Sequence, residues 1–449
     1  MKSQSDGLLG GKRVPTRKTV LFLAYLFPPT GGGGVQRSLK FVKYLPQTGW
    51  QPIVISVRPI SYYVYDSSLL KEVPSTVVIY RTHSLDPLRV SSILLGDARR
   101  ATAPRQVSHP VYSSNSRLTR AYRAVRPFVL FPDAQWPWIP FVFWRGLKLI
   151  RKHRPSVIYS PTAPYSSAIA AYLLSAATGI PYVLDFRDGW TDDAYHHPPT
   201  RFHRMLHRKL EKRVVTRASH VCVYGRWLGE RLASRYPSVA NRITEITNGF
   251  DPEDATGSGS IAKAPGKRRI VYSGSLFSHH REVFNTALTA ISQVPAEILK
   301  SLEVLVVGQA FEGAAEQVER LGLTTVVKLK GYLPHAEALA YLQSADATLL
   351  LVRRGDVASV TGKVFELMMV QAPIWALAEP SGECARILRM AGADAWLTAP
   401  DDVEGALTSL LGLFRAGFPR LTRSRVEVFS RVSQTQSLAN VLDLAANGS

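Results

Sequence analysis

The stretch that decides the fold runs from Val20 to Leu45 and reads VLFLAYLFPPTGGGGVQRSLKFVKYL. An apolar run, a glycine-rich turn and apolar residues at helical spacing predict a buried strand, a turn and an amphipathic helix. The glycines, Gly33 and Gly34 among them, let the backbone approach a ligand closely, and the N–H groups at the start of the helix suit an anion. Such a strand-to-helix crevice is the usual binding place of an open α/β sheet. A flexible connector is the alternative interpretation.

The turn does not have the spacing of a dinucleotide-binding fingerprint. Gln36 stands where the third glycine would be. The next predicted strand, residues 52–57, is followed by Arg58 instead of the acidic residue that would bind a ribose. The sequence therefore does not favour an NAD-binding site.

Length and composition indicate an ordinary globular protein. The 449 residues are enough for two or three domains, and 46% of them are hydrophobic and 20% charged. The two cysteines, Cys222 and Cys384, lie far apart and form no CxxC pair, so we expect neither a disulfide framework nor a metal site. A reducing compartment, the cytoplasm, is the expected setting.

Charge is distributed unevenly along the chain. Residues 1–250 carry 36 Lys and Arg against 13 Asp and Glu, a net +23, whereas residues 251–449 carry 19 against 21, a net −2. The basic half predicts an anionic partner, namely a membrane surface, a phosphorylated substrate or nucleic acid. We rank nucleic acid last because no recognition helix or RNA-binding motif occurs. No apolar run is long enough to span a membrane, which favours a soluble or peripheral protein.

Strand-like and helix-like segments alternate along the chain, which predicts two α/β domains with parallel sheets. The expected strands of the first domain are 20–25, 52–57, 76–80, 156–160, 182–185, 220–223 and 243–247, and those of the second are 269–273, 303–307, 326–329, 347–352 and 374–378. We expect a disordered basic tail (1–18), a first Rossmann-like domain (19–251), a linker (252–268), a second Rossmann-like domain (269–422) and a C-terminal helix (423–449) that packs towards the first domain. Residues 84–125 are poorly patterned and are interpreted as a long, partly helical insertion.

Two further segments of the basic half have two interpretations each. Residues 128–144 contain seven aromatic residues flanked by arginine and lysine, which suits a membrane interface or a ligand cleft as well as a packed core. Residues 201–217 form a very basic predicted helix with one apolar stripe. Such a stripe more often faces a core than anionic lipid. Its members are Phe202, Met205, Leu206, Leu210 and Val214.

Six short segments carry a resemblance to a known family. They are residues 27–37 (FPPTGGGGVQR), 185–190 (DFRDGW), 246–251 (ITNGFD), 331–334 (GYLP), 361–366 (TGKVFE) and 371–374 (QAPI). In this order the chain resembles nucleotide-sugar glycosyltransferases of the GT-B fold, in which two Rossmann-like domains face each other across a cleft, and in particular the large retaining family four.

The resemblance implies a donor site in the second domain. It implies that Glu366 binds the ribose, that Tyr332 and Leu333 lie in the loop that holds the base, and that Gly274 and Ser275 form a turn near the phosphates. Thr361, Gly362 and Lys363 precede Glu366 at the start of a predicted helix and are expected to face phosphate. The alternative is an ordinary surface ion pair between Lys363 and Glu366.

One position departs from the family pattern. Family four usually has a second acidic residue eight positions before the ribose glutamate, in contact with the donor sugar, and this chain has Ala358 there. Contact with the donor sugar is therefore expected to differ, and this favours a non-catalytic binding or scaffold protein as one alternative.

In the first domain, Asp185, Arg187 and Asp188 follow a predicted strand and are the candidate catalytic residues. They are expected to face the cleft, where they would orient acceptor hydroxyls or stabilise the leaving diphosphate. A buried structural pair of Asp185 with Arg187 is the other interpretation.

We expect a cytoplasmic, membrane-associated glycosyltransferase without a metal or other cofactor. The co-substrate would be a nucleoside diphosphate sugar and the acceptor a glycan or a lipid-linked molecule. A nucleotide-sugar epimerase of the same fold is the second alternative.

Overall fold

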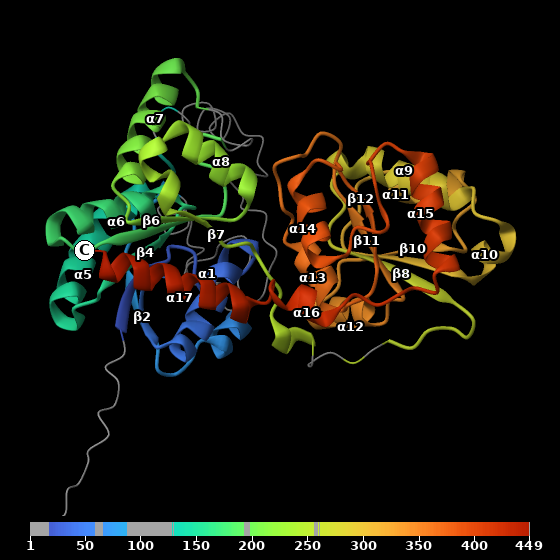
Figure 1. Cartoon of the computed structure of the whole chain (residues 1–449), viewed down its shortest axis with the longest axis horizontal. Coiled ribbons are helices and arrows are strands. Elements are labelled where there is room, and N and C mark those ends of the chain that lie inside the picture. The colour runs from blue at the N-terminus through green and yellow to red at the C-terminus, as the bar shows by residue number, and fades with distance from the viewer. Residues whose placement is uncertain are drawn as a thin grey trace, which may run out of the picture.

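The computed structural model describes residues 18–58, 66–87, 128, 130–192, 198–255, 259 and 261–448. These residues form two parallel β-sheets, each with helices on its faces (Figure 1). The predicted disordered tail lies outside the described residues except for Lys18, and so does most of the predicted insertion at 84–125. Among the described residues, no helix has the length and apolar character needed to cross a membrane.

The first sheet has the strand order β3-β2-β1-β4-β5-β6-β7, with neighbouring strands parallel. Its strands are β1 (Lys18–Leu23), β2 (Trp50–Val57), β3 (Val78–Thr82), β4 (Val157–Pro161), β5 (Tyr182–Phe186), β6 (His220–Val223) and β7 (Ile243–Glu245). The helices that accompany it are α1 (Gly33–Tyr44), α5 (Ile139–His153), α6 (Tyr165–Thr178), α7 (Arg201–Thr216) and α8 (Arg226–Arg235). The order reverses beside β1, so the crevice between β1 and β4 is where a ligand is expected.

Successive side chains of β1 point to opposite faces of this sheet and pack in a hydrophobic core on each face. Leu21 and Leu23 pack in the cluster that contains residues of α5 and α6, whereas Val20 and Phe22 pack in the cluster that contains residues of α1 and α17 (Arg431–Asn447). Because both faces are covered, β1 is apolar at every position from Val20 to Leu23.

The second sheet has the order β10-β9-β8-β11-β12-β13. Its strands are β8 (Arg268–Ser273), β9 (Leu302–Val307), β10 (Val327–Gly331), β11 (Ala347–Leu351), β12 (Ile374–Leu377) and β13 (Leu397–Thr398). Its helices are α9 (Arg281–Ser292), α10 (Ala296–Ser301), α11 (Ala314–Arg320), α12 (His335–Gln343), α13 (Lys363–Met369), α14 (Glu383–Ala391) and α15 (Val403–Arg415).

The chain crosses between the sheets twice, at neighbouring places. Phe250 and Ser430 form an isolated parallel bridge, and the N–H of Arg431 donates to the carbonyl of Phe250 at 2.7 Å. The C-terminal segment, predicted as one helix, is therefore two helices, α16 (Arg423–Glu427) and α17, because the bridge occupies the backbone between them. α17 runs back across the first sheet, next to α1 (Figure 1).

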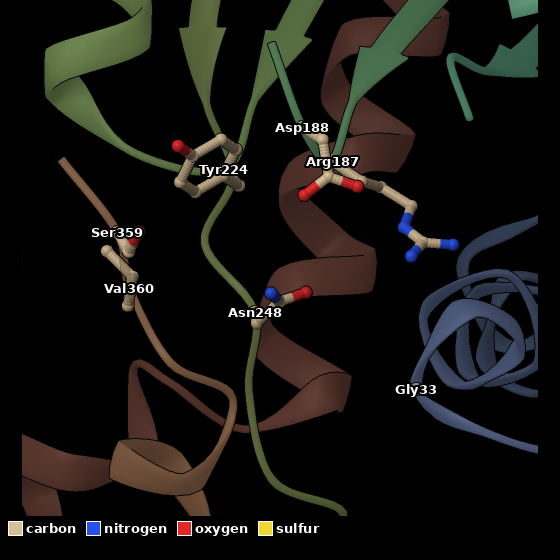
Figure 2. Close-up of a pocket in the computed structure, with 7 residues that line it drawn as sticks. All are labelled: Gly33, Arg187, Asp188, Tyr224, Asn248, Ser359 and Val360. Carbon is tan, nitrogen blue, oxygen red and sulfur yellow. The ribbon is translucent and has the colours of Figure 1, made fainter. Parts of the chain in front are cut away.

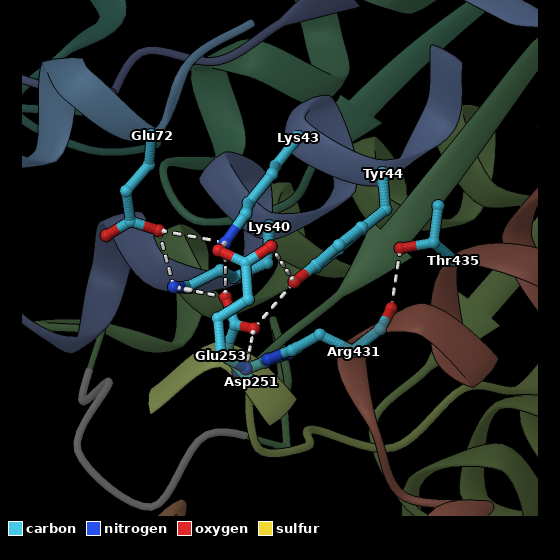
Figure 3. Close-up of polar contacts among 8 residues, drawn as sticks. All are labelled: Lys40, Lys43, Tyr44, Glu72, Asp251, Glu253, Arg431 and Thr435. Carbon is cyan, nitrogen blue, oxygen red and sulfur yellow. Dashed lines mark hydrogen bonds and ion pairs between the residues drawn. The ribbon is translucent and has the colours of Figure 1, made fainter. Parts of the chain in front are cut away.

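A polar network fixes the first crossing to α1 (Figure 3). The Asp251 carboxylate accepts hydrogen bonds from Lys40 at 2.6 Å, Lys43 at 2.9 Å and the Tyr44 hydroxyl at 2.6 Å. Burial alone would raise the pKa of Asp251, but these donors hold it well below its usual range. The start of the linker is thus anchored to the first domain by a charged residue that stays ionised.

Candidate functional site

Residues from both domains line one pocket, which we call the interdomain pocket (Figure 2). It encloses about 490 Å³ including its open mouth. The first domain contributes the start of α1 and the residues that follow β5, β6 and β7, so the carboxyl edge of its sheet forms one wall. The lining residues are Gly33, Arg187, Asp188, Tyr224, Asn248, Ser359 and Val360.

A second pocket, the second-domain pocket, adjoins the first, because Ser359 lines both. It encloses about 790 Å³ including its mouth and lies at the carboxyl edge of the second sheet, between the loop after β8, the loop after β11 and the start of α13. Its lining residues are Phe277, His279, His280, Leu351, Val352, Arg353, Asp356, Ser359, Thr361, Lys363 and Cys384.

The Lys363 side chain lies across the turn after β8. Its ammonium donates to the Tyr272 hydroxyl at 3.0 Å and to the Ser275 carbonyl at 3.3 Å. Gly274 has a φ of 131°, and a Cβ there would lie 2.1 Å from Lys363 Cε. Only glycine therefore leaves room for the lysine. The structure thus brings together three predicted donor-site residues, Gly274, Ser275 and Lys363.

Positive groups crowd the second-domain pocket. Burial lowers the pKa of Lys363 to about 8, with Glu366 opposing the change. Burial, followed by the charges of His279 and Lys363, lowers the pKa of His280 to about 4. Arg353 adds a further cation, and Asp356, the one acidic residue among the described residues that line this pocket, lies 3.4 Å from its Nε. A pocket whose cationic groups are partly desolvated is suited to an anion, which would stabilise their charged forms.

Glu366 lies one turn into α13 and is half-buried. Within the described residues its carboxylate makes no hydrogen bond and no ion pair, and burial raises its pKa. The predicted alternative of a Lys363–Glu366 surface ion pair is wrong, because Lys363 reaches Tyr272 and Ser275 instead. The carboxylate is consequently not engaged by a hydrogen bond within the described chain, although the charges of His335 and Lys363 act on it and Glu366 lines neither of the two pockets.

The other residues predicted for the donor site differ in whether they line a pocket. Thr361 lines the second-domain pocket, and Gly362 is exposed beside it. Tyr332 is 70% exposed and Leu333 half-buried in the loop after β10, and neither lines the two pockets described here.

At the glycine turn, the positive φ belongs to Gly32, at 89°, and not to Gly33 or Gly34. A Cβ on Gly33 would meet no atom within 4 Å and would project into open space. A Cβ on Gly34 would lie 3.0 Å from Leu26 Cδ1. Arg187 donates to the Gly34 carbonyl, so the end of β5 is joined to this turn.

Asp185, a predicted catalytic residue, does not face the cleft. It is 1% exposed and forms a bidentate ion pair with Arg37, at 2.7 Å to each oxygen, and it also accepts from the Tyr159 hydroxyl. The expectation of a cleft-facing carboxylate is wrong, and the alternative pairing with Arg187 is wrong in its partner. Arg187 and Asp188 remain at the interdomain pocket.

Comparison with solved structures identifies the arrangement of the two domains. Sucrose-phosphate synthase from Thermosynechococcus elongatus superimposes with a TM-score of 0.59 at 14% identity, covering 96% of this chain and 100% of the other. HepE from Anabaena, solved in complex with UDP, has a TM-score of 0.54 at 13% identity and covers 96% and 98%. A putative UDP-N-acetylglucosamine 2-epimerase from Listeria monocytogenes has a TM-score of 0.52 at 10% identity and covers 94% and 95%.

The chain has the GT-B fold. The sequence model of the family described as Glycosyltransferase Family 4 matches residues 76–254. The match to this family model confirms the predicted resemblance to family four, and the structural comparisons confirm the predicted fold. None of the curated proteins matches the chain.

Two buried arginines of this GT-B chain, Arg37 and Arg431, were not singled out from the sequence as candidate site residues. Arg37 donates to the carbonyls of Ile246 and Thr247 as well as to Asp185, so it holds the segment that carries Asn248 into the interdomain pocket. Arg431 is buried at the second crossing, and its Nη1 has no hydrogen-bond partner among the described residues. Burial, followed by the charge of Arg37, lowers the pKa of Arg431 to about 9.

Proposed function

We propose that this GT-B protein is a glycosyltransferase that moves a hexose-type sugar from a nucleoside diphosphate to a glycan or lipid-linked acceptor. The observation that carries the proposal is the pairing of an anion-deficient pocket with the free carboxylate of Glu366 on the same short helix as Lys363. A nucleoside diphosphate supplies what each part lacks, phosphate charge for the first and ribose hydroxyls for the second.

In this proposal the two pockets divide the reaction between them. Lys363 and Arg353 stabilise the negative charge that develops on the leaving diphosphate. Arg187 and Asp188 face the transferred sugar and the acceptor hydroxyl from the first domain. We expect no metal requirement, because cationic side chains already supply positive charge at the leaving group. Retention of the anomeric configuration is proposed from the resemblance to family four.

Ala358 leaves the donor sugar without the carboxylate usual in the family. Asp356, two residues earlier, lines the second-domain pocket and accepts a hydrogen bond from the N–H of Ser359 at 3.1 Å. We propose that Asp356 contacts the sugar hydroxyls instead. The acceptor and the pathway, which we propose to be polysaccharide or glycolipid synthesis at the cytoplasmic face of a membrane, follow from the basic first half and the family resemblance.

The first test is a thermal-shift screen with nucleoside diphosphates and their sugars, because a bound ligand raises the melting temperature. A rise with one nucleotide family supports the proposal, and no rise with any of them contradicts it. The GT-B epimerase neighbour gives a second candidate function. Incubating a labelled nucleotide sugar without acceptor separates the two, since an epimerase converts the sugar and a transferase leaves it intact or hydrolyses it slowly. Binding without either reaction would favour the scaffold alternative.

A further inference from the structure

The apolar stripe predicted on residues 201–217 is only partly covered in the structure. On α7, Val214 is fully buried and Leu206 and Leu210 are half-buried, as a core-facing stripe requires. Phe202 is 59% exposed and Met205 41% exposed. The first two turns of the helix therefore present large apolar side chains to solvent.

Basic residues surround these apolar side chains. The exposed basic residues of the helix are Arg201, Arg204, Arg208, Lys209, Lys212 and Arg213. Met205, Lys209 and Lys212 follow one another at helical spacing, so cations and apolar groups share one face. We call the exposed basic residues of α7, together with Phe202, Met205 and the neighbouring Phe128, the α7 surface. Phe128 is 52% exposed, and its carbonyl lies 3.3 Å from the His203 ring nitrogen.

The positive charge of the α7 surface is not neutralised by the rest of the described chain. Arg201, Arg204, Arg208, Lys209 and Lys212 form no ion pair and no hydrogen bond between side chains with any described residue. The single acidic residue of α7, Glu211, is buried, where it accepts from the Thr191 and Tyr236 hydroxyls. The exposed face thus carries cations and no anion.

We propose that the α7 surface docks the protein onto an anionic lipid membrane. Cations that flank exposed apolar side chains on one helical face match an interface in which acyl chains lie beneath anionic headgroups. Phosphate alone, as in nucleic acid, would match the cations but would leave Met205 and Phe202 without an apolar partner. Lipid is therefore the occupant that uses the whole surface.

The position of α7 suits a membrane-bound acceptor. Glu211 on α7 forms an ion pair with Arg235 on α8 at 3.2 Å, so the two helices are joined. Tyr224, just before α8, lines the interdomain pocket. In Figure 1, α7 projects beyond the other elements of the first domain, with α8 beside it. Docking through α7 would hold a lipid-linked acceptor near that pocket, a consequence that rests on the proposed function, whereas the docking itself does not.

Vesicle flotation with the full chain tests the proposal. One variant replaces Arg201, Arg204 and Arg208 with Gln, and a second carries Phe202→Ser and Met205→Ser. The matched controls replace the exposed Lys300, Arg415 and Arg423 with Gln, or carry Val428→Ser and Val432→Ser. Vesicles of phosphatidylcholine alone are compared with vesicles that contain phosphatidylglycerol as well.

We expect the parent to bind the anionic vesicles and not the neutral ones. Each α7 variant should lose about tenfold or more in partition, because every basic residue near the surface adds attraction and the apolar pair adds insertion. The controls should bind like the parent. Equal binding by α7 variants and controls would overturn the proposal. The proposal would also be overturned if the protein bound a single-stranded oligonucleotide instead of vesicles and only the arginine variant weakened that binding. All variants should keep the melting temperature and the nucleotide affinity of the parent. A loss of vesicle binding then concerns the α7 surface and not the proposed function.

Discussion

The carboxylate of Glu383 in the second domain accepts a hydrogen bond from the backbone N–H of Arg226 in the first domain, at 2.9 Å. Arg226 is the first residue of α8, and the preceding Gly225 has no side chain to cap that helix. A carboxylate from the opposite domain therefore caps α8. Arg386 of the second domain adds a second link. It forms ion pairs with its neighbour Glu383 and with Glu245 of the first domain.

These contacts predict that Glu383 helps to hold the domains together across the cleft. A hydrogen bond to a charged group contributes about 1.5–3 kcal/mol, so Glu383→Ala should shift the balance towards separated domains by about tenfold or more. Small-angle scattering should then give a larger radius of gyration. Glu230→Ala is the control, because it breaks an exposed pair with the same Arg226. An unchanged radius in Glu383→Ala would show that the contact does not govern the domain arrangement.

The ion pair of Arg37 with Asp185 should dominate the stability of the first domain. Removing one partner leaves a buried, unpaired charge, which costs about 3–5 kcal/mol, so Asp185→Ala should lower the free energy of unfolding by that amount. Urea unfolding measures it. Asp443→Ala, which removes an exposed ion pair with Lys18, should cost less than about 1 kcal/mol. Equal losses in the two variants would contradict the role given to Asp185.

The sequence predicted the sheets well because each strand carries its own signal. β6 occupies the predicted residues, His220–Val223, and the other predicted strands shift by no more than two residues at their ends. β13, with two residues, is too short to leave a pattern. The break between α16 and α17 could not be predicted, because Phe250, about 180 residues away in sequence, causes it.

The sequence indicated several residues that lie at the site, but not the groups with which their side chains interact. Lys363 and Glu366 stand at the spacing of a helical ion pair, but the turn after β8 offers the lysine a hydroxyl and a carbonyl that only the fold brings near. Asp185 is separated from its partner Arg37 by 148 residues. Local spacing identified these residues as important and did not show with which groups they interact.

The lowered pKa of Lys363 makes nucleotide binding depend on pH. Phosphate binds the charged ammonium, so affinity for a nucleoside diphosphate should fall as the pH rises through about 8. Without ligand the sign for stability is the opposite. The folded protein releases this proton at a lower pH than the unfolded chain does, so the lysine's contribution to stability rises between pH 8 and about 10.5.

Calorimetric titration at several pH values measures the first effect, and urea unfolding measures the second. Lys363→Met should bind more weakly at pH 7 and lose both pH dependences. If Lys363→Met kept the pH dependence of the parent, another group would be responsible.

The glycine turn should tolerate a side chain structurally but not functionally. A Cβ on Gly33 meets no neighbour, and its φ is not in the left-handed region, so Gly33→Val should fold with nearly unchanged stability. The valine would occupy space in the interdomain pocket, and turnover should fall by about a hundredfold or more. Gly259→Val, in the linker, is the control. Normal turnover in Gly33→Val would make the turn a mere connector.

The proposed function requires that the carboxylate of Glu366 bind the ribose hydroxyls of the nucleotide. A charge-assisted hydrogen bond contributes about 1.5–3 kcal/mol, so the loss of even one in Glu366→Ala should weaken nucleoside diphosphate binding by on the order of tenfold to a hundredfold or more. Stability should not fall, because burial is the largest effect on this carboxylate and no hydrogen bond within the described chain offsets it. Glu337→Ala, at an exposed position of α12, is the control and should bind like the parent.

Calorimetric titration of the parent and both variants with the nucleoside diphosphate that gives the largest thermal shift tests this claim most directly. We expect a large loss of affinity in Glu366→Ala alone, with its melting temperature retained. Unchanged affinity in Glu366→Ala would contradict the assignment of Glu366 as the group that binds the ribose.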